Sequence, residues 1–308
     1  MDNDKVEEAL ETLDQLCSSL WNAKTGNIPA ETLAHLPLSL ITLDHQSIIS
    51  GVAARYFIPW AEGDLRRYER NLVPEERNER ISTSERTLKY GCTMGFDLSR
   101  PWGSGGEWAE TMCCRFLEEV DMAPRKGTKG DRLPLRSLTG WRHSYYVHFS
   151  VAIPDEAPIP QPWHIERECY QWGPSCYWTL RGNKYSHVKA SMFHGVDGVD
   201  GMIIREEVMV IILVMISRLE NEDYAKHAVV PVMLFSFMRN HHGRILLAHC
   251  LENRLVVEMS PLYPFNIGEE GWEDSLALFT RYQVAGPSSL DTTEFPAAGR
   301  RSRIVAIR

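Results

Sequence analysis

The sequence lacks the features that mark secreted, membrane-bound and disulfide-stapled proteins. Its seven cysteines form no Cys-x-x-Cys pair, and an odd count in 308 residues argues against a disulfide framework or a zinc knuckle. The longest apolar run, Val208 to Ile216, is far shorter than the ~20 residues that a membrane-spanning helix needs. The N-terminus has neither the basic start nor the apolar core of a secretion signal. We therefore expect a cytoplasmic protein with reduced thiols and no membrane span.

Motifs of common catalytic centres are also missing. The chain has no His-Glu-x-x-His, no Gly-x-Ser-x-Gly and no Gly-x-Gly-x-x-Gly, and no lysine follows the Gly-Ser-Gly-Gly of 103–106. The stretch 164–166 followed by 174–176 partly matches a zinc deaminase, but the second thiolate of Cys-x-x-Cys is absent. We expect no metal site and no cofactor.

The charge balance is acidic, with 33 Lys and Arg against 41 Asp and Glu, a net charge of −8 and a pI of about 5.8. Nucleic acids and anionic membranes need a basic face, so we expect neither as a main partner. Hydrophobic residues make up 44% of the chain, which is ordinary globular usage and enough for a core without staples.

Hydrophobic patterning predicts one α+β domain over 1–308, with N-terminal helices plus a mainly antiparallel sheet packed on a buried central helix. Helical spacing of apolar residues favours helices at 5–21, 108–120, 205–220 and 272–282. The helix 205–220 is apolar on every side at its centre, which predicts burial, and its first-turn acids 206–207 suit the positive helix end. Strand patterns are found at 142–153, 176–180, 185–191, 229–238, 244–251 and 255–259.

Three segments are expected outside this core. The charged stretch 62–88 predicts a solvated face, with a lid over a pocket as the alternative. The Lys-, Arg-, Gly- and Pro-rich stretch 122–139 predicts a mobile connection, and 287–308 a loose tail.

The middle of the chain, 141–194, is rich in Trp, Tyr and His, which favours a pocket for an apolar organic molecule. The structural alternative is an aromatic strand core. The candidate pocket residues are Trp163, Tyr170, Trp172, Trp178 and Tyr145. The candidate donors to a substrate carbonyl are His164, His187, His194 and Arg244. For the last of these the structural alternative is a turn at Gly243 followed by a solvated arginine.

The order of helix 205–220 and three strands also matches the helix and meander of restriction-type nucleases. Such enzymes hold magnesium with an acid on one strand and an acid-x-Lys on the next. Here the matching positions are Ala248-His249 and Glu258-Met-Ser260, without the lysine. The alternative is therefore a non-catalytic binding or regulatory protein on a degenerate nuclease-like fold. A hydrolase centred on Cys250 or a histidine is a further rival.

Four stretches near the C-terminus, 231–238, 242–246, 255–257 and 262–265, carry a family resemblance. There the chain resembles fungal proteins of mostly unassigned function that accompany secondary-metabolite pathways. Such companions include cofactor-free cyclases of the norbornene-forming Diels–Alderase kind. The resemblance implies a cofactor-independent cyclase or isomerase that folds an apolar intermediate. It transfers no catalytic residue, because no motif is known to match.

Overall fold

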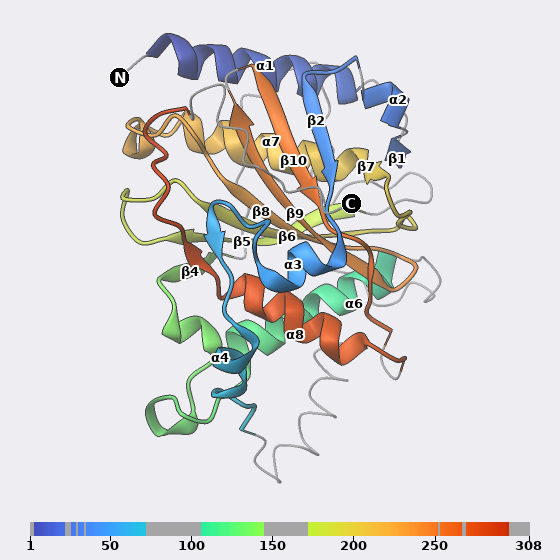
Figure 1. The fold of residues 1–308 in the computed structure, drawn as a ribbon, viewed down its shortest axis with the longest axis vertical. Coiled ribbons are helices and arrows are strands. Elements are labelled where there is room, and N and C mark those ends of the chain that lie inside the picture. The colour runs from blue at the N-terminus through green and yellow to red at the C-terminus, as the bar shows by residue number, and fades with distance from the viewer. Residues whose placement is uncertain are drawn as a thin grey trace, which may run out of the picture.

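The computed structural model describes residues 3–21, 26–28, 30–33, 35–71, 106–144, 172–251, 253–266 and 269–295. These residues form an α+β structure around one large sheet, as the sequence predicts (Figure 1). Among the described residues, no helix has the length and apolar character to span a membrane.

The main sheet has eight strands and runs in the order β2-β10-β9-β8-β6-β5-β4, with β11 beside β9. The bounds are β2 Leu38–Thr42, β4 Trp141–Ser144, β5 Trp172–Leu180, β6 Val188–His194, β8 Val232–Phe237, β9 His242–Leu251, β10 Arg254–Met259 and β11 Tyr263–Pro264. Two-residue strands form two smaller ladders: β1 Asn27–Ile28 with β7 Ile203–Ile204, and β3 Phe57–Ile58 with β12 Gly286–Pro287.

The sheet is mixed, so the expected antiparallel arrangement is only partly met. The pairs β2/β10 and β6/β8 are parallel, and the other described pairs of this sheet are antiparallel. The reason for the second parallel pair is the long helix α7, Arg205–Leu219, which connects β6 to β8. A helical crossover returns the chain to the end from which it left, and the next strand then runs parallel.

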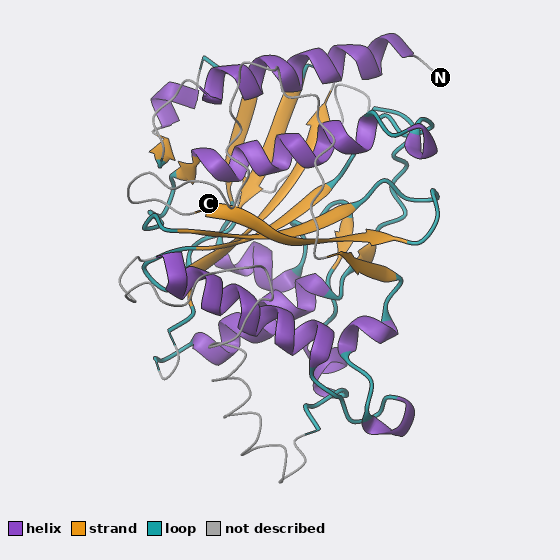
Figure 2. Cartoon of the chain, turned by 180° about the vertical axis from the view of Figure 1, so that it is seen from behind, coloured by secondary structure: helices purple, strands orange, loops and turns teal. Residues whose placement is uncertain are grey.

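Helices cover both faces of the sheet (Figure 2). One face packs against α7 and, beyond it, α1 (Asn3–Trp21); the other packs against α3 (His45–Ser50), α6 (Gly106–Leu117) and α8 (Trp272–Gln283). The shorter elements are α2 Ala30–Leu33, α4 Glu62–Arg66, the π-turn Glu118–Met122 and 3-10 turns at Lys129–Asp131, Leu135–Leu138 and Glu222–Tyr224. Because α7 lies between α1 and the sheet, every side chain from 206 to 216 is buried, as predicted for the central helix.

Several local predictions are confirmed. The β5–β6 hairpin turns at 181–184, where Gly182 has a φ of 71°, and the helices at 205–219 and 272–283 match their expected ranges. The turn expected at Gly243 is wrong. The chain turns at 239–241, and Gly243 lies inside β9, paired with Phe237 on one side and Tyr263 on the other.

The outlying segments are only partly described. In the charged stretch 62–88, the residues to 71 include the exposed helix α4, and 72–88 lie outside the described residues. The connection 122–139 contains two 3-10 turns and is tied by backbone hydrogen bonds from Arg125 to Leu133 and from Lys126 to Glu69. Of the expected strand 142–153, only β4 is described, and of the tail 287–308 the part beyond 295 lies outside the described residues.

Candidate functional site

Only part of the predicted pocket can be located. Four of its residues, His164, Trp163, Tyr170 and Tyr145, lie outside the described residues. The five that the structure describes are His187, His194, Arg244, Trp172 and Trp178, and all five are buried.

The two described tryptophans lie on opposite faces of the sheet. They are six residues apart on β5, and simple strand alternation would give them the same face. A bulge between Pro174 and Cys176 inserts one residue and reverses the alternation. Trp172 therefore packs in the core under α7, and Trp178 packs in the core under α6 and α8. These two side chains do not line one pocket.

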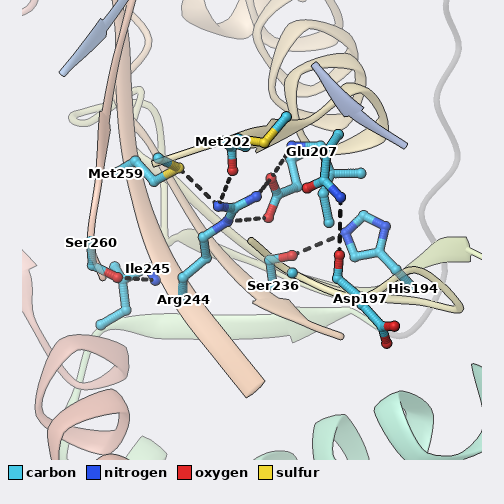
Figure 3. A network of polar contacts seen from close by, with 12 residues as sticks. His194, Asp197, Met202, Glu207, Ser236, Arg244, Ile245, Met259 and Ser260 are labelled. Atoms are coloured by element: carbon cyan, nitrogen blue, oxygen red, sulfur yellow. Dashed lines mark hydrogen bonds and ion pairs between the residues drawn. The ribbon is translucent and has the colours of Figure 1, made fainter. Parts of the chain in front are cut away.

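Arg244 on β9 is the centre of a buried polar network beneath the first turn of α7 (Figure 3). Its guanidinium forms a two-armed ion pair with Glu207, with Nε 2.8 Å from Oε1 and the second nitrogen on Oε2. Its third nitrogen donates to the Met202 carbonyl oxygen at 2.5 Å and contacts the Met259 sulfur at 2.9 Å. The expectation of a solvated arginine is wrong, since Arg244 is 0% exposed.

The same network includes His194. Its Nε2 lies 3.0 Å from the Ser236 hydroxyl, and that hydroxyl is also a hydrogen-bond partner of Glu207. Glu207 in turn accepts a bond from the Ile204 backbone N–H at 2.9 Å, so it caps α7. Burial acts to raise the pKa of Glu207, but the charge and hydrogen bonds of Arg244 outweigh it and leave the pKa below its ordinary value. These polar groups bind one another, and the network holds α7 on β8 and β9.

His187 and His194 also lie on opposite faces of the sheet. His194 faces α7, whereas His187 extends from the opposite face and its Nε2 lies 2.9 Å from the Tyr56 carbonyl oxygen. Burial lowers the pKa of each to about 4, so both imidazoles are neutral at neutral pH. The sequence-predicted donors are thus divided between two faces.

A different acid–base pair lies on the face opposite the Arg244 network. Glu258 on β10 stands opposite Leu247 of β9, and His249 stands opposite Val256. Residues facing each other across an antiparallel pair point to the same side, so Glu258 and His249 are diagonal neighbours on one face. The usual spacing of such diagonal positions is about 7–8 Å. The ring of Tyr56 lies 5.0 Å from that of His249. Within the described residues, neither the Glu258 carboxyl nor the His249 ring has a hydrogen-bond partner.

Burial displaces the pKa values of this pair in opposite directions. It raises the pKa of Glu258 to about 7, against the opposing charge of Arg55. Burial, together with the smaller effect of the Arg55 charge, lowers the pKa of His249 to about 4. Burial also raises the pKa of Tyr56. At neutral pH the site therefore holds a carboxyl that is about half protonated beside a neutral imidazole, which is a combination suited to acid–base chemistry.

The sequence did carry a signal for this pair. A single Glu interrupts the apolar strand Leu255-Val-Val-Glu-Met259, and a single His interrupts Ile245-Leu-Leu-Ala-His-Cys250. Glu258 is partly buried on a sheet face where apolar side chains are the usual occupants. Sequence reasoning examined these positions only for a nuclease site and did not consider them as an acid–base pair.

Two other polar groups are best explained as structural. Asp121, in the π-turn after α6, accepts hydrogen bonds from Trp178 Nε1 at 3.2 Å and His143 Nδ1 at 2.6 Å and pairs with Arg136 at 3.1 Å. Lys189 on β6 donates to three carbonyl oxygens at the end of α8, at 2.5–3.1 Å. Both tie a helix end to the sheet.

The metal and cysteine alternatives gain no support. In the part of the chain that the structure describes, no group of three His, Cys, Asp or Glu side chains is arranged to hold a metal ion. Burial raises the pKa of the Cys250 thiol to about 12, so at neutral pH it is a thiol and not the thiolate that a nucleophile requires.

Comparison with known proteins gives no relative: no family model, no curated protein and no solved structure matches this chain.

Proposed function

We propose that this protein is a cofactor-independent cyclase or isomerase whose reacting groups are Glu258 and His249. The observation that carries the proposal is the pair itself. Two titratable side chains of neighbouring strands share one sheet face, have pKa values displaced in opposite directions, and form no hydrogen bond to another described residue. Perturbed groups of this kind concentrate at functional sites.

Protonated Glu258 is the acid of the site. It donates a hydrogen bond to a carbonyl oxygen of the substrate, and this bond strengthens as negative charge develops on that oxygen in the transition state. In a cycloaddition the new carbon–carbon bonds form from π electrons of the substrate, so no proton is consumed. The low polarity that raises the pKa of Glu258 also strengthens the hydrogen bond.

His249 extends the same chemistry to isomerisation. Glu258 gives its proton to one atom of the substrate while the neutral imidazole removes a proton from another, which moves a double bond. The imidazolium and carboxylate that result lie on diagonal positions of one antiparallel pair. Transfer of the proton from imidazolium back to carboxylate, directly or through solvent, restores both groups. No cofactor enters this cycle.

The substrate that fits is a small, mostly apolar carbonyl compound, such as an intermediate of secondary metabolism. The net charge of −8 agrees with a partner that is not a nucleic acid. No described cysteine forms a disulfide, which agrees with work in the cytoplasm.

The test uses a small diene and dienophile, cyclopentadiene and methyl vinyl ketone, which combine in water without a catalyst to a racemic bicyclic ketone. The protein is expected to give an excess of one enantiomer at a rate above that of buffer. The variants Glu258→Leu and His249→Gln separate the roles: the first removes the hydrogen-bond donor and should lose both the excess and the rate, and the second should retain them. Glu273→Gln, on the exposed first turn of α8, is the matched control. A racemic product formed at the buffer rate would remove the cyclase.

A second candidate is a non-catalytic binding or regulatory protein on a nuclease-like fold. It is favoured by the order α7, β8, β9 and β10, a helix followed by an antiparallel meander. Ser260 stands where the nuclease lysine would be. This candidate predicts that small carbonyl compounds bind without turnover and that Glu258→Gln leaves their binding unchanged.

A further inference from the structure

Arg55 lies beside the Glu258 site and has no acidic partner among the residues that the structure describes. Its charge is close enough to influence the pKa of Glu258, His249 and Tyr56, and its guanidinium carbon is 5.5 Å from the centre of the Tyr56 ring. Within the described residues it forms no ion pair, and its side chain is partly exposed. A cation is thus available to a ligand at the edge of the site.

The Glu258 carboxyl does not fully neutralise this cation. Burial raises the pKa of the Glu258 carboxyl to about 7 despite the opposing effect of Arg55, so this group is only about half ionised at neutral pH. His249 is uncharged at the same pH. The local charge at neutral pH is therefore positive, and its complement is an anion. Arginine binds carboxylates through two parallel hydrogen bonds, which fixes the orientation of the bound group.

The segment that carries Arg55 is also apolar at its surface. Ile49 is 36% exposed, Val52 83% and Ile58 58%. A single exposed aliphatic side chain is ordinary, but three of them occur within ten residues of sequence around Arg55, which has no ion pair in the described part of the chain. A ligand with an apolar body next to its charged group could cover these side chains and pair with the arginine at once.

We infer that the ligand of this site is an amphipathic carboxylate, whose anionic group pairs with Arg55 while its apolar body lies against the 49–58 segment and reaches Glu258. This inference rests on the proposed function, because it names the substrate class of the same site. It adds a specificity that the acid–base pair alone does not give, namely preference for an acid over its ester or alcohol.

Binding of an anion here has a second consequence. A negative charge beside Glu258 disfavours its carboxylate form and so raises its pKa, which means that the site takes up a proton as the ligand binds. A surface arginine that merely attracts anions would show no such uptake.

The experiment measures binding of straight-chain carboxylates, from hexanoate to palmitate, by isothermal titration calorimetry below their micelle-forming concentrations. Each acid is compared with its methyl ester and with the corresponding alcohol. The wild-type protein is expected to bind the best acid roughly tenfold or more tightly than its ester. Arg55→Gln should remove this preference, and Arg181→Gln, at the exposed β5–β6 turn, should keep it. Equal affinity for acid and ester, an unchanged Arg55→Gln variant, or no binding across the series would overturn the inference.

Proton uptake is read from the same titrations near pH 7.5 in two buffers that differ in ionisation enthalpy. Uptake is expected for the wild-type protein and should vanish in Glu258→Gln. If the acids bind through Arg55 and take up a proton but the cycloaddition stays racemic, the anion site stands and the cyclase fails. If the cycloaddition is enantioselective but acid and ester bind alike, the cyclase stands and the anion site fails.

Discussion

The buried pair of Glu207 and Arg244 gives the sharpest stability prediction. The side chains are 0% and 1% exposed, so neither group can turn to water when its partner is lost. Glu207→Gln isolates the charge: the amide oxygen can still accept from the Ile204 N–H and cap α7, while Arg244 loses its counter-charge. Breaking a buried ion pair by removing one partner costs about 3–5 kcal/mol.

The assay is urea unfolding followed by circular dichroism and by tryptophan fluorescence, whose agreement checks two-state behaviour. A loss of about 4 kcal/mol should lower the Tm on the order of 10 °C. Asp197→Asn is the control, because the pair that Asp197 makes with Arg239 has similar two-armed geometry but is 44–48% exposed, and its loss should cost within about 1 kcal/mol.

The double variant Glu207→Leu with Arg244→Met shows whether the loss in free energy of unfolding comes from the missing attraction or from a buried arginine charge that has lost its partner. Hydrophobic replacement of both partners removes the buried charge, so the double variant should recover at least about half of the lost free energy of unfolding. A wild-type-like free energy of unfolding for Glu207→Gln, within about 1 kcal/mol, would refute the reasoning. The pair should also weaken in acid. The folded pKa of Glu207 is below its unfolded value of ~4.3, so the stabilisation is complete above that pH and disappears as pH falls through the folded pKa.

Two further predictions follow the same logic. Burial raises the pKa of Glu258 in the folded protein to about 7. The contribution of this group to the free energy of unfolding is therefore fully present below the unfolded pKa of ~4.3 and is lost as pH rises to about 7. Glu258→Gln should therefore match the wild type near pH 4 and exceed it at pH 8 in urea unfolding; an equal difference at both pH values would contradict the assignment. Lys189→Met leaves three carbonyl oxygens at the end of α8 without their donor and should cost about 2–4 kcal/mol, whereas Lys226→Met, at an exposed position, should be neutral in the same assay.

Local pattern was enough to predict the elements around this core. The apolar centre of α7 predicted burial, and its position between two layers explains why no polar face is needed. The strands β8, β9 and β10 follow from dense apolar runs separated by short turns. Gly182-Asn183 predicted the β5–β6 turn because glycine adopts a positive φ without strain.

Long-range geometry was beyond the same reasoning. Glu207 and Arg244 are 37 residues apart, and their pairing depends on the register of β9 against β8 and on the position of α7 above them. The bulge in β5 is one extra residue, yet it moves Trp172 and Trp178 to opposite faces and divides the aromatic region. The period-two pattern of a strand sequence does not indicate where such an insertion occurs.

The described candidate donors do not share one site, and the Glu258 site was not predicted from the sequence. Both results have the same cause. Composition indicated which residue types a pocket needs, and it favoured the segment richest in Trp, Tyr and His. The described part of that segment uses its polar groups inside the fold: His187 on the Tyr56 carbonyl, His194 on Ser236. Glu258 and His249 lie in strands that are otherwise apolar, where composition gives almost no signal, and they came into view only through strand register and burial.

Strand β9 carries both kinds of polar group, one on each face. Its register with β8 and β10 is continuous, so Arg244 and His249, five residues apart, point to opposite sides. On the α7 side, Arg244 donates to Glu207, Met202 and Met259, which come from three segments, and so stabilises the fold. On the other side, Glu258 and His249 have no partner within the described residues, and burial of an unpaired carboxyl destabilises the fold. Substitutions on the two sides should therefore change stability in opposite directions: removing the Arg244 pair lowers it, whereas removing the Glu258 carboxyl raises it and, under the proposed function, abolishes activity. A polar group that lowers the stability of its own fold needs a reason outside the fold, and a ligand that takes its hydrogen bond supplies one.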